Sequence, residues 1–295
     1  MKILNFGSLN LDLVYQIPHF VRAGETLSTT GFSRNVGGKG LNQSVALAKA
    51  GAEVYHAGLI GADGGILKDF LAENGVDTRF VHTIDCPSGH AVIQVVPEGN
   101  NCIFLYGGAN QMVSEAFIAE ALEPFTEGDF LVLQNEINMI DKIILAAAEK
   151  GMQVVLNPSP IADNLKELPL EKISWFILNE IEGGELSGET EAEKILDKLT
   201  ALYPHAKIVL TLGGDGSVYA DSAQRIRQAA FRVQAVDTTA AGDTFTGFFF
   251  AAMAEGAAPA DALLRASKAS SISVTRAGAA ASIPKLEEVL EALKA

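Results

Sequence analysis

The chain has 295 residues, of which 48% are hydrophobic and 20% are charged. This length and composition are typical of a globular protein of one or two domains and exclude a disordered chain or a coiled coil. With 36 acidic residues against 22 Lys and Arg residues, the net charge is −14, which argues against a nucleic-acid partner because clustered basic side chains bind phosphates.

We expect a cytoplasmic protein with no membrane partner. No uninterrupted apolar run reaches the roughly 18 residues that a membrane helix needs, and the first residues lack the pattern of a secretory signal. The only two cysteines, Cys86 and Cys102, do not have a metal-binding spacing, which fits a reducing compartment.

Short apolar runs alternate with amphipathic segments along most of the chain. Residues 3–6 predict a buried strand, and residues 39–50 predict a helix that ends at Gly51. Further strands are predicted at residues 130–133, 153–156, 175–178 and 207–212, and helices at residues 141–150 (capped by Asp141), 191–202 and 246–255. Strands separated by helices indicate an α/β fold with a mostly parallel central sheet flanked by helices.

Two segments, residues 12–36 and 85–107, alternate between apolar and polar residues without helical periodicity. Gly99, Asn100 and Asn101 form a plausible hairpin turn inside the second segment. We interpret both segments as a small antiparallel sheet that projects as a lid from a single domain of residues 1–295. The alternative is that they are edge strands of the main sheet.

Polar side chains follow nearly every predicted strand, and ligands of open parallel sheets bind outside the carboxyl ends of the strands. The strand ends therefore predict a cleft for a polar ligand. The residues concerned are Asn10 and Asp12, Gln134 to Glu136, Asn157 and Ser159, Asn179 and Glu182, and Thr211.

A glycine-rich segment at residues 36–42 precedes the first predicted helix. It is not a Walker A loop, because Ser33 and Gly40 stand where that motif needs Gly and a hydroxyl residue. The glycines allow a ligand to approach the backbone closely, and Asn42 offers both a donor and an acceptor. The alternative is a tight helix start with no ligand.

A second segment, DTTAAGDTF at residues 237–245, precedes the last strongly apolar helix. Small residues there leave N–H groups unpaired, and the helix dipole adds positive potential, so the segment predicts an anion site. Asp243 is either an ordinary helix cap or a base beside a bound phosphate.

These segments resemble the signatures of the ribokinase family of sugar kinases. The similar stretches are residues 10–12, 37–43, 231–236, 237–245 and 274–278, and the resemblance covers essentially the whole chain in the expected order. It implies a mostly parallel sheet with a small β lid, lids that interlock into a homodimer, and transfer of the ATP γ-phosphoryl group to the primary hydroxyl group of ribose.

The resemblance also implies roles for individual residues. Asp243 is the catalytic base, with an anion hole made by the N–H groups of Ala241, Gly242 and Asp243. The implied sugar-binding residues are Asn10, Asp12, Gly38, Lys39, Asn42, Glu136 and Asp243. The implied ATP-binding residues are Asn179, Thr211, Gly213, Gly214, Gly216, Gly242 and Ser267. Asn179 and Glu182 act on Mg²⁺ indirectly, and a K⁺ site is implied at Asp237, Thr239, Ser273, Arg276, Gly278 and Ser282.

Some positions depart from the family pattern, and all lie on the nucleotide side. They are Ile181, Gly214, Asp215 and Ser267, which leave the nucleotide preference open. Alternatives to a ribose acceptor are another furanose or a nucleoside. A sugar-binding protein without catalysis is a further alternative, against which the intact Asp243 argues.

Overall fold

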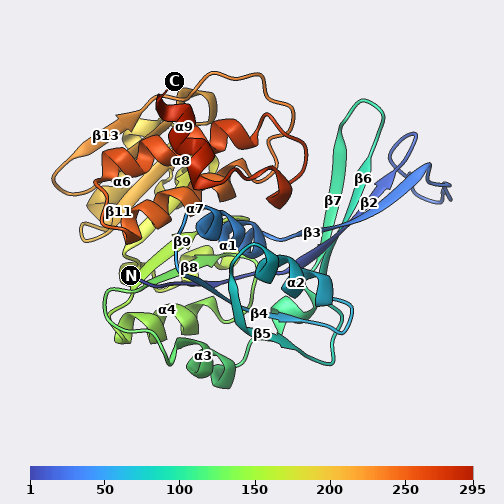
Figure 1. Cartoon of the computed structure of the whole chain (residues 1–295), viewed down its shortest axis with the longest axis horizontal. Coiled ribbons are helices and arrows are strands. Elements are labelled where there is room, and N and C mark those ends of the chain that lie inside the picture. The colour runs from blue at the N-terminus through green and yellow to red at the C-terminus, as the bar shows by residue number, and fades with distance from the viewer. Residues whose placement is uncertain (295) are drawn as a thin grey trace.

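The computed structural model describes residues 1–294, apart from the side chains of residues 163 and 164, and contains two sheets of unequal size (Figure 1). In this part of the chain the larger sheet has nine strands in the order β13-β12-β11-β10-β9-β8-β1-β4-β5. All pairs from β5 to β11 are parallel, and β12 and β13 continue the sheet in antiparallel pairs. The predicted mostly parallel sheet is confirmed. Its strands are β1 (Ile3–Phe6), β4 (Val54–Ile60), β5 (Asp77–Thr83), β8 (Phe130–Gln134), β9 (Gln153–Asn157), β10 (Trp175–Asn179), β11 (Lys207–Thr211), β12 (Ser217–Ala220) and β13 (Arg225–Gln228).

Helices cover both faces of this sheet because alternate strand residues point to opposite sides. Leu131 and Leu133 of β8 pack in the core beneath α3, α4 and α6, whereas Phe130 and Val132 pack beneath α1, α2, α7 and α8. The helices are α1 (Lys39–Lys49), α2 (Gly65–Glu73), α3 (Glu115–Leu122), α4 (Ile140–Glu149), α5 (Glu180–Ser187), α6 (Ala192–Leu202), α7 (Ala241–Ala254), α8 (Pro259–Ser273) and α9 (Leu286–Lys294). Short 3-10 turns lie at Gly108–Gln111, Asp163–Glu167, Leu170–Lys172, Gly213–Asp215 and Ala280–Ser282.

Two helix starts differ from the prediction. The helix α7 begins at Ala241, five residues before the predicted start, because the small residues of its first turn carry no apolar periodicity. The helix α4 is capped by Met139 with φ 57°, and not by Asp141. The Asp141 carboxylate lies in the first turn, where it still faces the positive end of the helix dipole.

The smaller sheet has the order β3-β2-β6-β7 and is separate from the larger one, so the alternative of edge strands is wrong. Its strands are β2 (Asn10–Gln16), β3 (Gly31–Gly37), β6 (Gly89–Val95) and β7 (Asn101–Tyr106). The two outer pairs are antiparallel, and the central pair of β2 and β6 is parallel. Figure 1 shows this sheet projecting beyond the helices. Asn10 and Asp12, predicted to follow β1 as its polar end, belong to β2.

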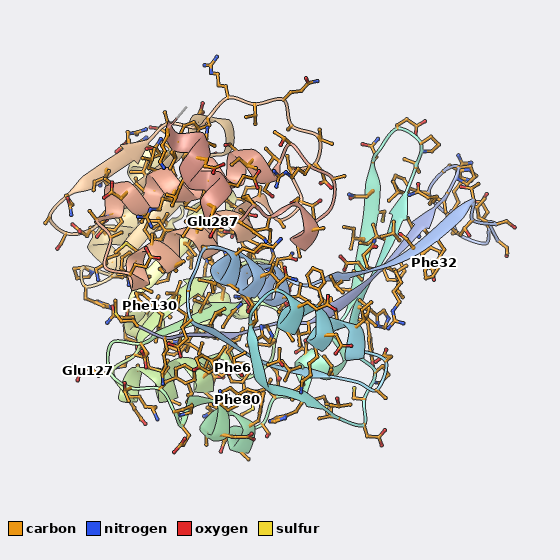
Figure 2. The ribbon with its side chains drawn as sticks, viewed as in Figure 1. Phe6, Phe32, Phe80, Glu127, Phe130 and Glu287 are labelled. Atoms are coloured by element: carbon orange, nitrogen blue, oxygen red, sulfur yellow. The ribbon has the colours of Figure 1, made fainter. Side chains whose placement is uncertain are left out.

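Aromatic side chains mark the difference between the two sheets. Phe6 and Phe80 are buried in the core beneath α3 and α4, whereas Phe32 on β3 is 57% exposed (Figure 2).

None of the helices within residues 1–294 has the length and apolar character that crossing a membrane requires.

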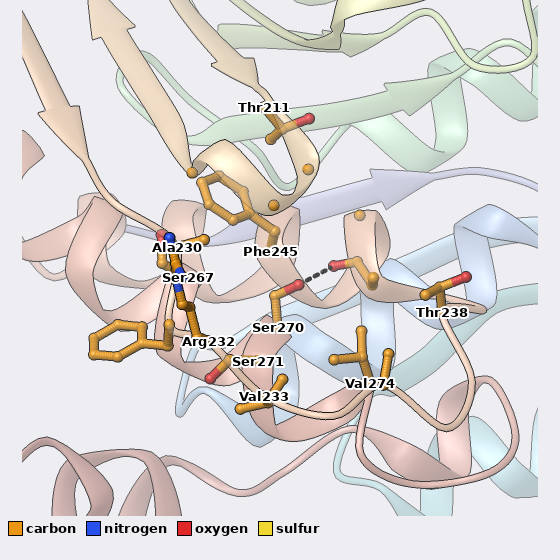
Figure 3. Close-up of a pocket in the computed structure, with 17 residues that line it drawn as sticks. Thr211, Ala230, Arg232, Val233, Thr238, Phe245, Ser267, Ser270, Ser271 and Val274 are labelled. Carbon is orange, nitrogen blue, oxygen red and sulfur yellow. Dashed lines mark hydrogen bonds between the residues drawn. The ribbon is translucent and has the colours of Figure 1, made fainter.

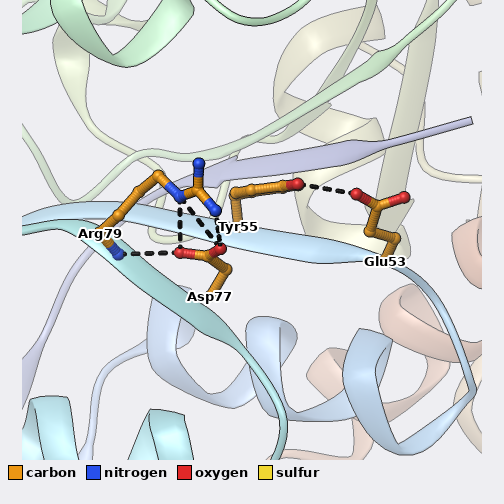
Figure 4. A network of polar contacts seen from close by, with 4 residues as sticks. All are labelled: Glu53, Tyr55, Asp77 and Arg79. Carbon is orange, nitrogen blue, oxygen red and sulfur yellow. Dashed lines mark hydrogen bonds and ion pairs between the residues drawn. The ribbon is translucent and has the colours of Figure 1, made fainter.

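A polar network holds the outer edge of the larger sheet (Figure 4). Arg79 of β5 pairs with Asp77 at 2.6 Å, and its guanidinium lies 5.2 Å from the centre of the Tyr55 ring on β4. The Tyr55 hydroxyl donates to Glu53 at 2.7 Å. The β4–β5 register shifts between Tyr55 and Ala57, so the network spans an irregular part of the sheet edge.

Candidate active site

The helix α7 begins at an open end that faces two cavities. Ala240 precedes it with φ 59° and has no side chain that could cap the helix. The N–H group of Ala241 donates to the Thr238 carbonyl at 3.2 Å, whereas those of Gly242 and Asp243 have no protein acceptor within the described residues. Two of the three predicted donors are therefore open, and the helix dipole favours an anion beside them.

Asp243 lies in the first turn of α7 and is only 7% exposed. Asn42 donates its Nδ2 to Oδ2 of Asp243 at 3.0 Å, and Gln43 donates its Nε2 to Oδ1 at 2.9 Å. Both donors come from α1, which packs closely against α7. A Cβ atom at Gly247 would lie 2.3 Å from the Cβ of Ala46, so this approach requires glycine.

A second carboxylate, Glu136, lies on the same side of the sheet after β8. It accepts hydrogen bonds from the Ser8 hydroxyl and, at 3.1 Å, from the Lys39 N–H. Burial raises the pKa of Glu136, with a smaller contribution from Asp243. Burial and the Glu136 charge raise the pKa of Asp12 to about 6. The carboxylates therefore share one electrostatic environment, which suits a ligand rich in hydroxyl groups.

The remaining predicted sugar-binding residues adjoin these carboxylates. Asn10 pairs in register with Gly37, and its Oδ1 accepts from Nδ2 of Asn110 at 2.8 Å. Gly38 has φ 95°, and a Cβ there would lie 3.0 Å from the Ser8 carbonyl oxygen, so only glycine fits. The Oδ1 atom of Asn42 is buried and has no partner among the described residues. The structure thus brings the predicted sugar-binding residues into one cluster.

A cavity of about 600 Å³ lies between the start of α7, helix α8 and the loop after β11 (Figure 3). Most of the predicted ATP-binding residues line it, namely Thr211, Gly213, Gly214, Gly216, Gly242 and Ser267. Asn179 instead lines a neighbouring cavity of about 250 Å³, together with Lys39, Glu182 and Asp243. Thr211, Thr238, Ala241 and Gly242 line both cavities, which therefore adjoin at the open end of α7.

Asn179 and Glu182 form a capping box at the start of α5. The Glu182 N–H donates to Oδ1 of Asn179, and the Asn179 N–H donates to Oε2 of Glu182, both at 2.9 Å. The pair therefore has a structural role. Among residues 1–294, no three His, Cys, Asp or Glu side chains converge as a metal site.

The structure also gathers the residues predicted for K⁺. Asp237 accepts the N–H groups of Thr239 and Gly278, each at 2.9 Å. Partial burial acts to raise the pKa of Asp237, but hydrogen bonds from Thr239 and Gly278 outweigh it and lower that pKa. The hydroxyl groups of Ser273 and Ser282 lie 2.7 Å apart. The Arg276 side chain turns away to pair with Glu288, which leaves only its backbone for this cluster.

Sequence reasoning missed two groups of residues around the site. Phe231, Arg232, Phe245 and Val274 line the larger cavity. They belong to stretches that carry the family resemblance, but their mostly apolar side chains alone did not indicate a role at the site. Gln43 contacts Asp243 directly, and its position next to Asn42 in the glycine-rich segment was the available signal.

The chain is similar to known proteins over nearly its whole length. The model of the pfkB family of carbohydrate kinases matches residues 1–286. A ribokinase of Haemophilus influenzae is 36% identical over 297 residues, covering 98% of this chain and 97% of that protein. A Cryptococcus neoformans ribokinase solved with ADP has a TM-score of 0.87 and 34% identity, covering 99% of each chain. An Arabidopsis thaliana ribokinase solved with ribose and ATP has a TM-score of 0.88 and 31% identity, covering 100% of this chain and 98% of that one.

Proposed function

The chain belongs to the pfkB family of carbohydrate kinases, and from this premise we propose that it transfers the γ-phosphoryl group of ATP to the primary hydroxyl group of D-ribose. One observation carries the proposal. The Asp243 carboxylate lines the smaller cavity, beside the cluster of Asp12 and Glu136 and next to the larger, glycine-lined cavity. A relative solved with ribose and ATP supports this choice of acceptor and donor.

The reaction joins the sugar oxygen to the γ-phosphorus while the bond from that phosphorus to ADP breaks. Asp243 orients the primary hydroxyl group and takes its proton, a role that typically contributes about 10²- to 10⁴-fold to the rate. The open N–H groups of Gly242 and Asp243 stabilise charge on the transferring group, and each such donor contributes about 10²- to 10³-fold.

The larger cavity is the proposed ATP site, with the phosphates directed toward α7. The glycines at positions 213 and 214 leave open space at their Cα atoms, which allows the nucleotide to approach the backbone. The Ser267 hydroxyl is buried at this cavity without a partner among the described residues, so it can take up a hydrogen bond from the nucleotide. Asn179 acts from the neighbouring cavity on the phosphates.

We propose that Asn179 and Glu182 hold Mg²⁺ through its water molecules. Glu182 uses Oε2 in the capping box, which leaves Oε1 at the smaller cavity for this purpose. A single carboxylate fits Mg²⁺, which commonly keeps several waters and is otherwise held by substrate phosphates. When bound, Mg²⁺ supplies positive charge that screens the phosphates. Glu182 would orient the water molecules of Mg²⁺, and Lys39 would orient the phosphates.

We propose that K⁺ binds beside the anion hole. Oxygen atoms of Asp237, Thr239, Ser273, Arg276, Gly278 and Ser282 would hold it, several of them backbone carbonyls. An anionic Asp237 that joins two loops fits a hard monovalent cation. When bound, K⁺ supplies positive charge near the open N–H groups, so replacing K⁺ by tetramethylammonium should lower kcat. An unchanged kcat would contradict this site.

The smaller sheet is the proposed lid over the sugar and the proposed dimer interface. All of β7 is exposed, and its side chains from Ile103 to Tyr106 are each at least 50% exposed. An exposed apolar edge strand of this kind is typical of a surface that pairs with another chain. Closure of the lid would exclude water and limit hydrolysis of ATP.

We also propose a cytoplasmic location. ATP is available there, and both Cys86 and Cys102 are free thiols in the structure, as a reducing compartment maintains them. Cell fractionation with an antibody to the chain tests this location, and recovery outside the cytoplasm would contradict it.

The direct test of the function is ADP release in a coupled assay with Mg²⁺ and K⁺. Ribose should give kcat/KM at or above about 10⁴ M⁻¹s⁻¹, well above 2-deoxyribose, fructose and nucleosides. If only another acceptor gives turnover, the protein is still a kinase, but ribose is not its substrate. Sugar binding without any ADP release would favour the non-catalytic alternative.

A further inference from the structure

We propose that Gln43 is a positioning residue that fixes the Asp243 carboxylate through a chain of buried amide side chains. The inference rests on the proposed function, in which Asp243 is the base. Gln43 is fully buried on α1 and donates Nε2 to Oδ1 of Asp243 at 2.9 Å. Gln43 itself lines neither cavity, and Asp243 is its contact within the proposed catalytic machinery.

The orientation of the Gln43 amide is set by its neighbours on the sheet. Its Oε1 accepts from Nε2 of Gln134 at 2.7 Å, and the same Nε2 donates to Oδ1 of Asn5 at 2.9 Å. Asn5 is oriented in turn because its Nδ2 donates to the Gly40 carbonyl at 2.7 Å. A flipped Gln43 would place its oxygen against the Asp243 carboxylate and would lose its hydrogen bonds with Asp243, Gln134 and Asn157.

A second branch of the chain uses the other N–H of Gln43. Its Nε2 donates to Oδ1 of Asn157 at 3.1 Å, and Nδ2 of Asn157 donates to the Ile177 carbonyl of β10 at 3.0 Å. Strands β1, β8, β9 and β10 therefore all contribute to the position of one carboxylate oxygen. Buried networks are rigid where their donors and acceptors are satisfied, as the amide of Gln43 is. The Oε1 atom of Gln134 is buried and has no partner among the described residues.

The two oxygens of Asp243 consequently have different roles. Oδ1 is bound to Gln43, which is anchored on both sides. Oδ2 is bound to Asn42, whose own Oδ1 has no partner among the described residues and which belongs to the proposed sugar-binding set. Asn42 can thus exchange its contact for the sugar, and the hydroxyl proton passes to Oδ2 while Gln43 keeps Oδ1 in place.

The first test replaces Gln43 by Met, which keeps the length of the side chain and removes its donors. We expect kcat for ribose to fall by about 10²-fold, as misplacement of a catalytic group by about 1 Å does, with KM changed by less than about threefold. Asn74→Ala is the control, because it removes a hydrogen bond that the Asn74 side-chain amide donates to the Phe70 carbonyl, far from the site. A kcat for Gln43→Met within threefold of wild type would overturn the proposal.

A double-mutant cycle separates positioning from general loss of structure. If Gln43 acts through Asp243, then adding Gln43→Met to Asp243→Asn lowers kcat no further. Equal losses of kcat in both backgrounds would contradict the proposal.

Gln43→Glu adds a signature in the pH profile. The new carboxylate faces Asp243 and repels it when ionised, but can donate an O–H when protonated. The deficit in kcat relative to wild type should therefore shrink as the pH falls. A deficit that is constant with pH would show that the donor at this position is not what matters.

The same double-mutant cycle can be measured by denaturant unfolding, which does not depend on enzyme turnover. Coupling between Gln43 and Asp243 should make the losses of unfolding free energy non-additive, and additive losses would overturn the proposal. If the wild-type protein phosphorylates no sugar, the proposed function fails, yet the unfolding cycle still decides whether Gln43 holds Asp243.

Discussion

At the scale of single residues, the Asp243 carboxylate differs from its neighbours in its hydrogen-bond partners. Asp243 is held by two amide donors from α1 and lies beside two N–H groups without protein partners. Asp12 and Glu136 lie on the proposed sugar side, and burial raises the pKa of both. In the proposed reaction, the carboxylates of one cluster are thus divided between holding the substrate and taking its proton.

Asp243→Asn should lower kcat by about 10²- to 10⁴-fold, because asparagine keeps the shape of the side chain and cannot take the hydroxyl proton. Binding of ATP, measured by calorimetry, should change little. A loss of kcat smaller than about tenfold would remove Asp243 from the role of base.

Asp12→Asn should stabilise the protein at high pH and weaken ribose binding. Burial followed by the Glu136 charge raises the pKa of Asp12 from 3.8 to about 6, so the fold favours the protonated form. The stability from Asp12 is present below pH 4 or so and is lost as the pH rises through about 6. Unfolding by denaturant should show a gain for the variant of up to about 3 kcal/mol at pH 8. The gain should vanish near pH 4, and a gain of the same size at both pH values would contradict the assignment.

At the scale of elements, α7 combines an open end with a close-packed body. Gly242 faces open space at the cavity, whereas a Cβ at Gly247 would lie 2.3 Å from Ala46 on α1. The two glycines of this helix are therefore present for different physical reasons. One leaves room for a ligand, and the other allows the two helices that carry Asn42 and Asp243 to approach.

The two substitutions to alanine should separate these reasons. Gly247→Ala should lower the unfolding free energy by about 1–3 kcal/mol through overpacking. Gly242→Ala should leave stability unchanged or slightly higher and should raise KM for ATP. Denaturant unfolding and steady-state kinetics on both variants decide this, and equal losses of stability would contradict it.

Much of this organisation could be predicted from the sequence. Strands such as β8 and β10 begin as continuous apolar runs, which local pattern identifies, and polar residues at their ends mark the edge of the sheet where we propose that ligands bind. The true start of α7 could not be predicted, because Ala and Gly have no periodicity. The chain from Gln43 to Gln134 and Asn5 joins residues more than 90 positions apart, so only the fold brings it together.

At the scale of the whole molecule, the smaller sheet projects from the body of the protein (Figure 1) and carries an exposed apolar edge strand. Its strand β7 presents four consecutive apolar side chains, Ile103 to Tyr106, that are each at least half exposed. A surface of this kind on a chain of net charge −14 needs local apolar contact to associate, since the overall charge opposes it.

Phe104→Glu should shift the protein from dimer to monomer. A carboxylate in the centre of β7 would be buried unpaired in the proposed interface. Light scattering after size-exclusion chromatography measures the mass, and Ile66→Glu on α2, also exposed, is the control. A monomeric wild-type protein would contradict the proposed interface.

The parallel pairing of β2 with β6 makes the smaller sheet a cantilever. Both hairpins leave the body at the same end, where Asn10 is in register with Gly37 on one side and with Gly89 on the other. Asp12 lies only two residues along β2 from this root. When the free tip of the sheet moves, the sheet therefore bends beside the carboxylates. Motion of the proposed lid and binding of a ligand at Asp12 and Glu136 are then coupled to each other.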